Sequence, residues 1–334
     1  MSQSTRSRQK WRIVLLSVTA WLHATAFAIA SPCVYWTGAL EETASALKAA
    51  GVMRICVPPD RVDGWRAAGF EPVATTEADL ATRTALPVPG LASRLDLVSS
   101  TRSPWIDANG WRFVRKPDGQ FVYELPAGRA ALAAAEASMF DVDAVLKIDP
   151  ADLPGVGEVL AFGAQIAFAD LPPVADIAVV DDGTAEAGEA MNLLARRNLL
   201  YTPVAKRSSS KQPIIVALGT KRYPRKAAAN PSEFAQRVRR ELTDPRRTLR
   251  IYGSEVVLAR LTGDDTHRRL LLINYGGRDV DGLRVRLLGS WQVESMKVAG
   301  KPDVSPQDVA VADGATEFSI PALGLLAVVD LTSQ

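Results

Sequence analysis

The segment 105–111, Trp-Ile-Asp-Ala-Asn-Gly-Trp, carries the most suggestive side-chain chemistry in this sequence. Two indoles flank a carboxylate, an amide and a glycine that lets the backbone turn. Indole faces suit the apolar CH face of a sugar ring, while carboxylate and amide groups hydrogen-bond to hydroxyls. We therefore predict that Trp105, Asp107, Asn109 and Trp111 contact carbohydrate, with Asp107 as a candidate catalytic carboxylate. The alternative is a loop that two large side chains anchor to the core.

Further carboxylates lie at the ends of predicted strands. Glycoside hydrolysis needs only two carboxylates, and ligands of α/β folds gather at the carboxyl ends of strands. Asp181 and Asp182 directly follow a predicted strand and are secondary candidates. Their alternative role is to cap the helix that follows, where negative charge is favourable. Glu124 and Asp149 occupy similar positions.

Histidine and cysteine are too scarce for several kinds of site. The chain has two of each, so a histidine-based triad, a multi-histidine metal site or a zinc-binding cysteine cluster is not expected. A glycine-rich phosphate loop is also missing, and we predict no metal and no cofactor. Cys33 and Cys56 fall in neighbouring predicted strands, offset by about three residues or ~10 Å. We therefore expect them to stay unpaired.

The segment 206–250 is strongly basic, with thirteen Lys and Arg residues against three acidic ones. Such a segment suits an anionic surface or an acidic protein partner. The alternative is that it forms salt bridges with the acidic α/β region that precedes it. We do not expect nucleic acid as a partner.

The first part of the chain alternates strand and helix signals. Strands are predicted over 33–36, 53–57, 71–74 and 144–148, and helices over 40–50, 61–68, 128–138 and 153–168. This alternation is typical of parallel α/β units. We also expect a strand at 95–99 and a hairpin formed by 111–114 and 121–125, because Pro117-Asp118-Gly119 is a turn signal.

Two further patterns follow. Residues 176–204 predict a βαβ unit, with a buried strand at 176–180, a helix at 185–197 and a returning strand at 199–204. A strand at 214–218 and a helix beginning near Asn230 come next. From residue 249 onward the hydrophobic period changes to two, as in 283–287 and 316–320, which predicts an antiparallel β-sandwich.

This order of elements resembles the architecture of β-galactosidase-like glycoside hydrolases, which have a catalytic (β/α)-barrel, a flavodoxin-like middle domain and a small β domain. The resemblance implies an α/β plus all-β fold: a partial (β/α)-barrel-like region at 31–171, a small flavodoxin-like βαβ domain at 172–248 that contains most of the basic segment, and a C-terminal antiparallel β-sandwich at 249–334. The first region has about 140 residues, whereas a full barrel takes about 250. No catalytic residue is therefore carried over from the family.

The N-terminus predicts export. Four basic residues before position 13, an apolar stretch over 13–22 and the small residues of Ala28-Ile29-Ala30 match a signal peptide at 1–30. We expect cleavage after Ala30, no transmembrane segment in the mature chain, and a periplasmic or extracellular location. An uncleaved membrane anchor is the alternative.

The sequence therefore predicts an exported glycoside-hydrolase-like protein that binds or processes carbohydrate, with or without catalytic activity. If it is an enzyme, it is a glycoside hydrolase that uses two carboxylates. The alternative is a non-enzymatic envelope protein that binds an anionic surface or a protein partner through the basic segment 206–250.

Overall fold

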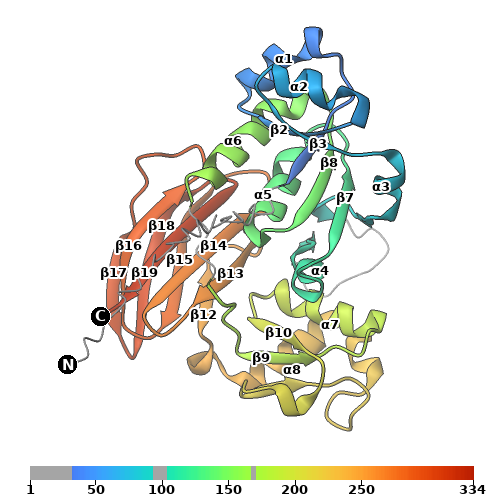
Figure 1. Cartoon of the computed structure of the whole chain (residues 1–334). Helices are drawn as coiled ribbons and strands as arrows, with labels where there is room; N and C mark the ends of the chain where they lie inside the picture. Colours follow the sequence, from blue (N-terminus) through green and yellow to red (C-terminus); the bar gives the residue numbers. More distant parts are fainter. Residues whose placement is uncertain (1–31, 93–103, 167–170) are drawn as a thin grey trace, which may run out of the picture.

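The computed structural model describes residues 32–92, 104–166 and 171–334. The predicted signal peptide and the predicted strand at 95–99 lie outside these residues. The described chain contains a parallel α/β unit, a smaller parallel α/β unit and an antiparallel β-sandwich (Figure 1). The predicted α/β plus all-β fold class is thus confirmed.

The first unit is built on a six-stranded sheet in the order β3-β2-β1-β8-β7-β4, in which every pair is parallel. From β1 the chain passes to β2 and β3 on one side, and β4, β7 and β8 return towards β1 on the other. This is the strand order of a parallel barrel that is opened between β3 and β4. It agrees with the expected partial (β/α)-barrel-like region. The strands are β1 Cys33–Tyr35, β2 Arg54–Val57, β3 Glu71–Ala74, β4 Thr84–Leu86, β7 Gln120–Glu124 and β8 Asp143–Lys147.

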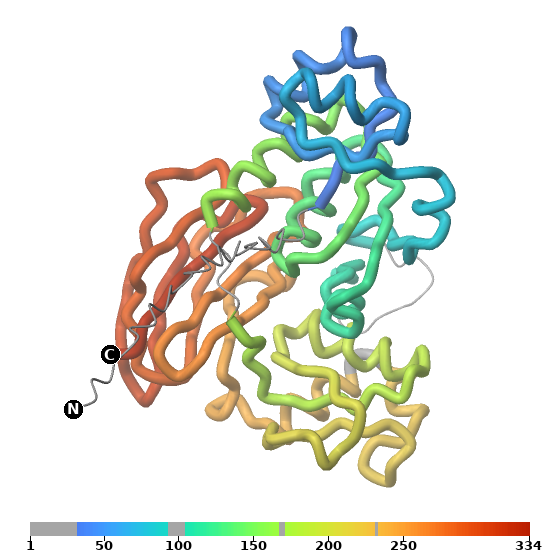
Figure 2. The backbone as a smooth tube through the Cα atoms, viewed as in Figure 1, coloured from blue at the N-terminus to red at the C-terminus, as the bar shows by residue number. Residues whose placement is uncertain are grey.

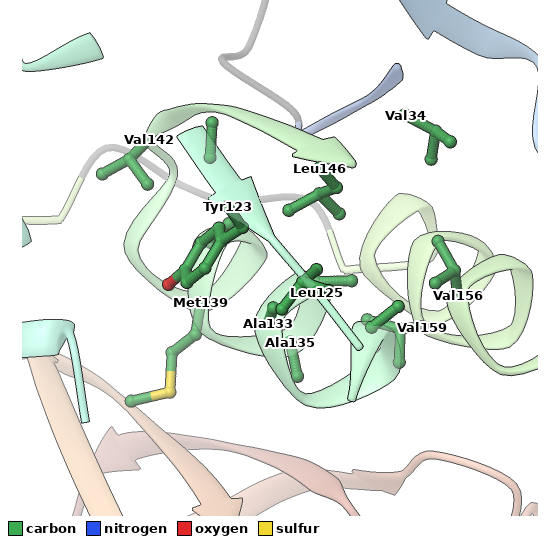
Figure 3. Close-up of a cluster of buried hydrophobic side chains, with 14 of the residues drawn as sticks. Val34, Tyr123, Leu125, Ala133, Ala135, Met139, Val142, Leu146, Val156 and Val159 are labelled. Carbon is green, nitrogen blue, oxygen red and sulfur yellow. The ribbon is translucent and has the colours of Figure 1, made fainter. Parts of the chain in front are cut away.

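Helices cover one face of this sheet and share its main hydrophobic core. Helices α1 Leu40–Ala49, α2 Val62–Ala67, α5 Ala130–Phe140 and α6 Leu153–Ala164 all contribute buried residues to that core. Figure 3 shows the alanines of α5 packed beneath Leu125 and Leu146, with Val156 and Val159 of α6 beside them. On the other face, Leu80 of α3 Glu77–Thr82 joins a small separate cluster with Val122 and Val145.

Cys33 and Cys56 lie in that small cluster and form a disulfide. The expectation that they stay unpaired is wrong. The register places Cys56 beside Tyr35, two residues beyond Cys33 rather than three. The two Cα atoms are 5.7 Å apart, which is within disulfide reach.

The predicted hairpin is also wrong, because residues 111–114 lie in a helix, α4 Gly110–Arg115. The local alternation of apolar and polar residues imitates a strand. In the helix, Phe113 instead packs on Phe121 in the core, with ring centroids 5.0 Å apart. Trp111 and Val114, three positions apart and so on one helix face, line a cavity next to the middle unit. The turn at Pro117-Asp118-Gly119 therefore leads from α4 into the parallel strand β7.

The smaller units follow the predicted patterns. The middle sheet has the parallel order β10-β9-β11, and the sandwich has two antiparallel sheets in the orders β12-β15-β18-β17 and β13-β14-β19-β16. A short antiparallel pair, β5 with β6, belongs to the first unit. The bounds are β5 Gly90–Ala92, β6 Trp105–Asp107, β9 Ile177–Val180, α7 Ala185–Ala195, β10 Tyr201–Val204, β11 Ile214–Val216, α8 Pro231–Leu242, β12 Leu249–Tyr252, β13 Val257–Gly263, β14 His267–Asn274, β15 Val280–Leu288, β16 Trp291–Val298, β17 Gln307–Ala312, β18 Ala315–Leu323 and β19 Leu326–Ser333.

The sandwich and the middle unit both pack against the first unit. Helix α5 lies against β14 of the sandwich, and α4 packs on α7 of the middle unit (Figure 2). Met139 of α5 extends towards the sandwich strands (Figure 3), where it lines the same cavity as Leu258 and Ile273. Among the helices in the described ranges, none is both long and apolar enough to cross a membrane.

Candidate functional site

Three neighbouring strands of the first sheet end in one row of side chains. Tyr35 at the end of β1 is in register with Lys147 at the end of β8, which is in register with Glu124 at the end of β7. Residues in register point to the same face of a sheet. The row lies at the carboxyl ends of the strands, and this is the end at which parallel α/β folds, barrels included, bind their ligands.

Glu77, the first residue of α3, completes this row. Its Oε1 accepts a 2.9 Å hydrogen bond from the Tyr35 hydroxyl, and its Oε2 lies 3.8 Å from the Lys147 Nζ. On the other side, Glu124 Oε1 lies 3.3 Å from the same Nζ. These two carboxylate oxygens are therefore no more than about 7 Å apart. We call Tyr35, Glu77, Glu124 and Lys147 the strand-end cluster.

The strand-end cluster is open to solvent. The side chains of Glu77 and Glu124 are 73% and 79% exposed, whereas that of Lys147 is 30% exposed. Exposed ion pairs contribute little to stability, so a ligand can replace these contacts at little cost. Burial, followed by the neighbouring Glu77 carboxylate, raises the pKa of Tyr35. Its hydroxyl therefore remains a hydrogen-bond donor at neutral pH.

A hollow of about 540 Å³ adjoins the strand-end cluster. Its volume lies within the range of roughly 300–1,000 Å³ that small-molecule sites occupy. Glu124 and Asp149, both singled out from the sequence, meet here, although Asp149 also caps the next helical turn through the Ala151 N–H. The hollow is lined by Glu124, Leu125, Pro126, Ala127, Lys147, Ile148, Asp149 and Pro150.

Trp105 and Asp107, two of the predicted sugar-contacting residues, bind each other in β6. The Trp105 Nε1 donates a 2.8 Å hydrogen bond to Asp107 Oδ1. The guanidinium of Arg196, at the end of α7, stacks on the Trp105 ring at 3.2 Å from its centroid. One face of the Trp105 indole is therefore in contact with the middle unit.

Asn109 and Trp111 also pack against other parts of the protein. Asn109 is fully buried, and its Nδ2 donates to Glu136 Oε2 at 3.1 Å. Trp111 packs against Gly188 of α7, where a Cβ would come within 2.7 Å of the indole. Trp111 also lines the cavity between the units, whose volume of about 80 Å³ is well below that of a ligand pocket. Sugar contact by the segment 105–111 stays a prediction, and the structure gives its side chains packing roles at the junction of two units.

Asp181 and Asp182 both have protein partners. Arg115 binds Asp181 with two hydrogen bonds of 2.7 and 2.8 Å, and it lowers the pKa of that carboxyl. Asp182 accepts hydrogen bonds from Thr184 and from Arg225, and these lower its pKa to about 2. The two carboxylates thus occupy the loop before α7 as charged anchors near the helix N-terminus, while Thr184 forms the cap itself.

Comparisons with known proteins concern the fold as a whole. The sequence matches no family model and no curated protein. Among solved structures, it is similar to α-L-fucosidase isoenzyme 2 from Paenibacillus thiaminolyticus, with a TM-score of 0.51 and 10% identity over 82% of this chain and 71% of that one. The fold resembles that of glycoside hydrolases. A cold-adapted β-galactosidase from Rahnella sp. R3 also matches, with a TM-score of 0.39 and 9% identity over 66% of this chain and 56% of that one.

Three members of the strand-end cluster were missed by sequence reasoning. Glu124 was named as a strand-end carboxylate, but Tyr35, Glu77 and Lys147 were not. Glu77 lies directly after Thr76, which forms a capping box with Asp79, and this motif after a predicted strand is the signal that was available. Lys147, the last residue of a predicted strand, gave no comparable signal.

The basic segment 206–250 is partly neutralised, although not by the first unit. Glu241 pairs with Arg222 and Arg237, and Asp244 pairs with Arg239 and Arg247. The segment therefore supplies much of its own counter-charge. Seven exposed cations form no ion pair within the described residues: Lys206, Arg207, Lys211, Lys221, Lys226, Arg240 and Arg246.

Metal binding finds no support in the described part of the chain. There, the His, Cys, Asp and Glu side chains form no group of three or more that could hold a metal ion.

Proposed function

We propose that this protein is exported and binds carbohydrate at the strand-end cluster of its glycoside-hydrolase-like fold. The observation that carries the proposal is the row formed by Tyr35, Lys147 and Glu124, which stands with Glu77 beside a hollow at the carboxyl ends of parallel strands. The likeness in fold to an α-L-fucosidase supports carbohydrate as the ligand class.

The chemistry of the site suits a sugar. The carboxylates of Glu77 and Glu124 accept hydrogen bonds from hydroxyls, and Lys147 donates to hydroxyl or ring oxygens. Exposed apolar residues in the lining, namely Pro126, Ala127 and Pro150, offer contact to the CH groups of the ring. A site of a few polar groups on an apolar wall is typical of small-ligand recognition.

Hydrolysis is the second activity that the site supports. One carboxyl group would act as the acid and the other as nucleophile or base, and Glu77 and Glu124 are the two carboxylates that flank Lys147. The ammonium of Lys147 lies between the two carboxylates. A substrate would have to displace Lys147 to reach both of them, so binding is the function proposed first.

A glycan array followed by titration calorimetry tests binding. We expect the secreted protein to bind at least one glycan, and Glu124→Gln to weaken that binding about tenfold, as expected for loss of a charged hydrogen-bond partner. Glu71→Gln is the matched control. Glu71 is an exposed carboxylate at the amino end of β3, whereas the strand-end cluster lies at the carboxyl ends of the strands. An unchanged affinity in Glu124→Gln would reject the strand-end site.

The same preparation tests hydrolysis. Aryl glycosides of the sugar that binds should release the aryl group if Glu77 and Glu124 act as a pair, and either Glu→Gln change should abolish the release. If the protein binds the glycan but releases no aryl group, it is a carbohydrate-binding protein without this hydrolytic activity.

A second candidate function is attachment to an anionic envelope surface through the basic segment. The seven exposed cations without ion pairs favour it. Binding to anionic vesicles that falls steeply with added salt, and is lost when Arg207 and Lys211 become Gln, would support this function. Export itself is tested by the intact mass of the secreted product, which should begin at Ser31.

A further inference from the structure

The sandwich carries a second hollow, of about 560 Å³, far along the chain from the strand-end cluster. It lies between the sheet β12-β15-β18-β17 and the helical turn η5 Asp244–Arg246. Three guanidinium groups and two carboxylates face it. Its lining is Pro245, Arg250, Arg284, Arg286, Ala310, Ala312, Asp313 and Glu317.

The strand register sets two arginines side by side in this hollow. Arg250 of β12 is directly opposite Arg286 of β15, which is opposite Glu317 of β18. Like charges in directly opposed positions destabilise a sheet unless a counter-charge compensates them. The arrangement therefore calls for negative charge close to both guanidinium groups.

The protein supplies that charge only in part. Glu317 binds Arg284 at 2.8 Å and lies 3.6 Å from the Arg286 Nε. Asp244 lies 3.9 Å from Arg250, but it already binds Arg239 at 2.6 Å. Glu317 and Asp244 are thus each shared between arginines. Their shorter contacts are with Arg284 and Arg239, not with Arg250 or Arg286.

Arg250 and Arg286, the opposed pair, each have a buried N–H group that lacks a hydrogen-bond acceptor within the described part of the chain. Arg286 is only 8% exposed, and its Nη1 has no hydrogen-bond partner among the residues that the structure describes. The same holds for the Nε of Arg250. Buried N–H groups without an acceptor are unfavourable, so the chain leaves the positive charge of Arg250 and Arg286 incompletely compensated.

We propose that this hollow binds an oxyanion, namely a carboxylate, sulfate or phosphate group, that bridges Arg250 and Arg286 while Arg284 contacts it from the rim. Guanidinium groups bind such groups with paired, charge-assisted hydrogen bonds. Tyr252, opposite Arg284 in register, is 38% exposed, and its ring lies 4.9 Å from the Arg250 guanidinium carbon. Tyr252 lies next to two arginines of the hollow without lining it, and its ring would offer an apolar contact to a sugar that extends from the hollow, which favours an acidic sugar over a free inorganic ion.

Titration calorimetry with D-glucuronate, inorganic sulfate and D-glucose tests the proposal, with chloride keeping the ionic strength constant. Glucuronate and sulfate should bind saturably and glucose should not bind. Arg250→Gln and Arg286→Gln should each weaken binding about tenfold or more. Lys211→Gln is the matched control, because Lys211 is an exposed cation outside the hollow.

Glu317→Gln separates a ligand site from a purely structural ion-pair network. It removes the carboxylate that Arg284 and Arg286 share, so anion binding should tighten several-fold. This variant and Arg250→Gln also carry the test if Arg286→Gln does not fold.

Three results would count against the proposal. Anion effects no larger than those of chloride would overturn it, as would equal weakening by Lys211→Gln and Arg250→Gln. Sulfate binding as tightly as glucuronate, with no effect of Tyr252→Ala, would keep the oxyanion site and overturn the acidic sugar as its source.

Discussion

Tyr275, which follows β14 in the sandwich, donates a 2.5 Å hydrogen bond to the Glu136 carboxylate in α5 of the first unit. Glu136 is fully buried and also accepts hydrogen bonds from the Tyr123 hydroxyl and from the backbone and side chain of Asn109. One carboxylate thus joins a strand of the parallel sheet, the segment before α4, and the sandwich. Because buried polar networks are stable only when fully hydrogen-bonded, this residue holds the units in one arrangement.

Tyr275→Phe should therefore destabilise the protein. The change leaves the buried Glu136 carboxylate with one donor fewer, at a cost of about 1–3 kcal/mol. Urea denaturation measures the loss. Tyr252→Phe is the control, since Tyr252 is an exposed tyrosine. Equal stability of the two variants would mean that the Tyr275 hydroxyl adds nothing.

Glu136 should also make stability depend on pH. Burial raises its pKa from 4.5, although the four donors oppose this shift. Between the unfolded and folded pKa values the folded state binds a proton that the unfolded state has lost, so stability falls as the pH rises through that window. The stability of the wild type relative to Glu136→Gln should thus decrease from about pH 4.5 upward, as measured by denaturation at several pH values. A difference that stays constant with pH would contradict the burial argument.

The disulfide between Cys33 and Cys56 should contribute measurably to stability. It closes a loop between residues 23 apart in sequence, for which the loss of chain entropy in the unfolded state is worth about 3 kcal/mol. Denaturation of the Cys33→Ala, Cys56→Ala double variant should show that loss, and thiol titration of the denatured wild type should find no free thiol. Two titratable thiols in the secreted protein would show that the pair is not formed.

Trp111→Ala should lower stability and leave carbohydrate binding unchanged. Trp111 packs against Gly188 at the junction of the first and middle units, and truncation of a large packed side chain costs roughly 3 kcal/mol. Gly188→Ala is a matched change on the other side of the same contact, and it should destabilise because the new Cβ overlaps the indole. Loss of glycan binding at full stability would instead support sugar contact by the segment 105–111.

The elements of the fold were largely predictable from sequence because their signals are local. Hydrophobic runs marked β1, β2, β3, β7 and β8 of the first unit and the strands of the middle unit, but not β4, β5 or β6. The period-two alternation in 283–287 and 316–320 marked the sandwich. What failed depends on register and tertiary packing. A one-residue error in the offset between β1 and β2 hid the disulfide, and α4 was mistaken for a strand because Phe113 and Trp111 find partners far away in the chain.

The candidate site was less predictable than the fold. Glu124 could be named because it ends a hydrophobic run, but its neighbours across the sheet depend on strand order. The sequence indicated parallel strands without showing that β8 lies between β1 and β7. That order brings Lys147 between Tyr35 and Glu124, and it turns a single strand-end carboxylate into a cluster.

Amide chemical shifts recorded while a glycan identified on the array is titrated into the protein test the central claim most directly. Binding at the strand-end cluster predicts that the largest shifts fall at Tyr35, Glu77, residues 124–127 and residues 147–150, with little change in the sandwich. Shifts centred on the segment 105–111, or the absence of any glycan that binds, would contradict the account.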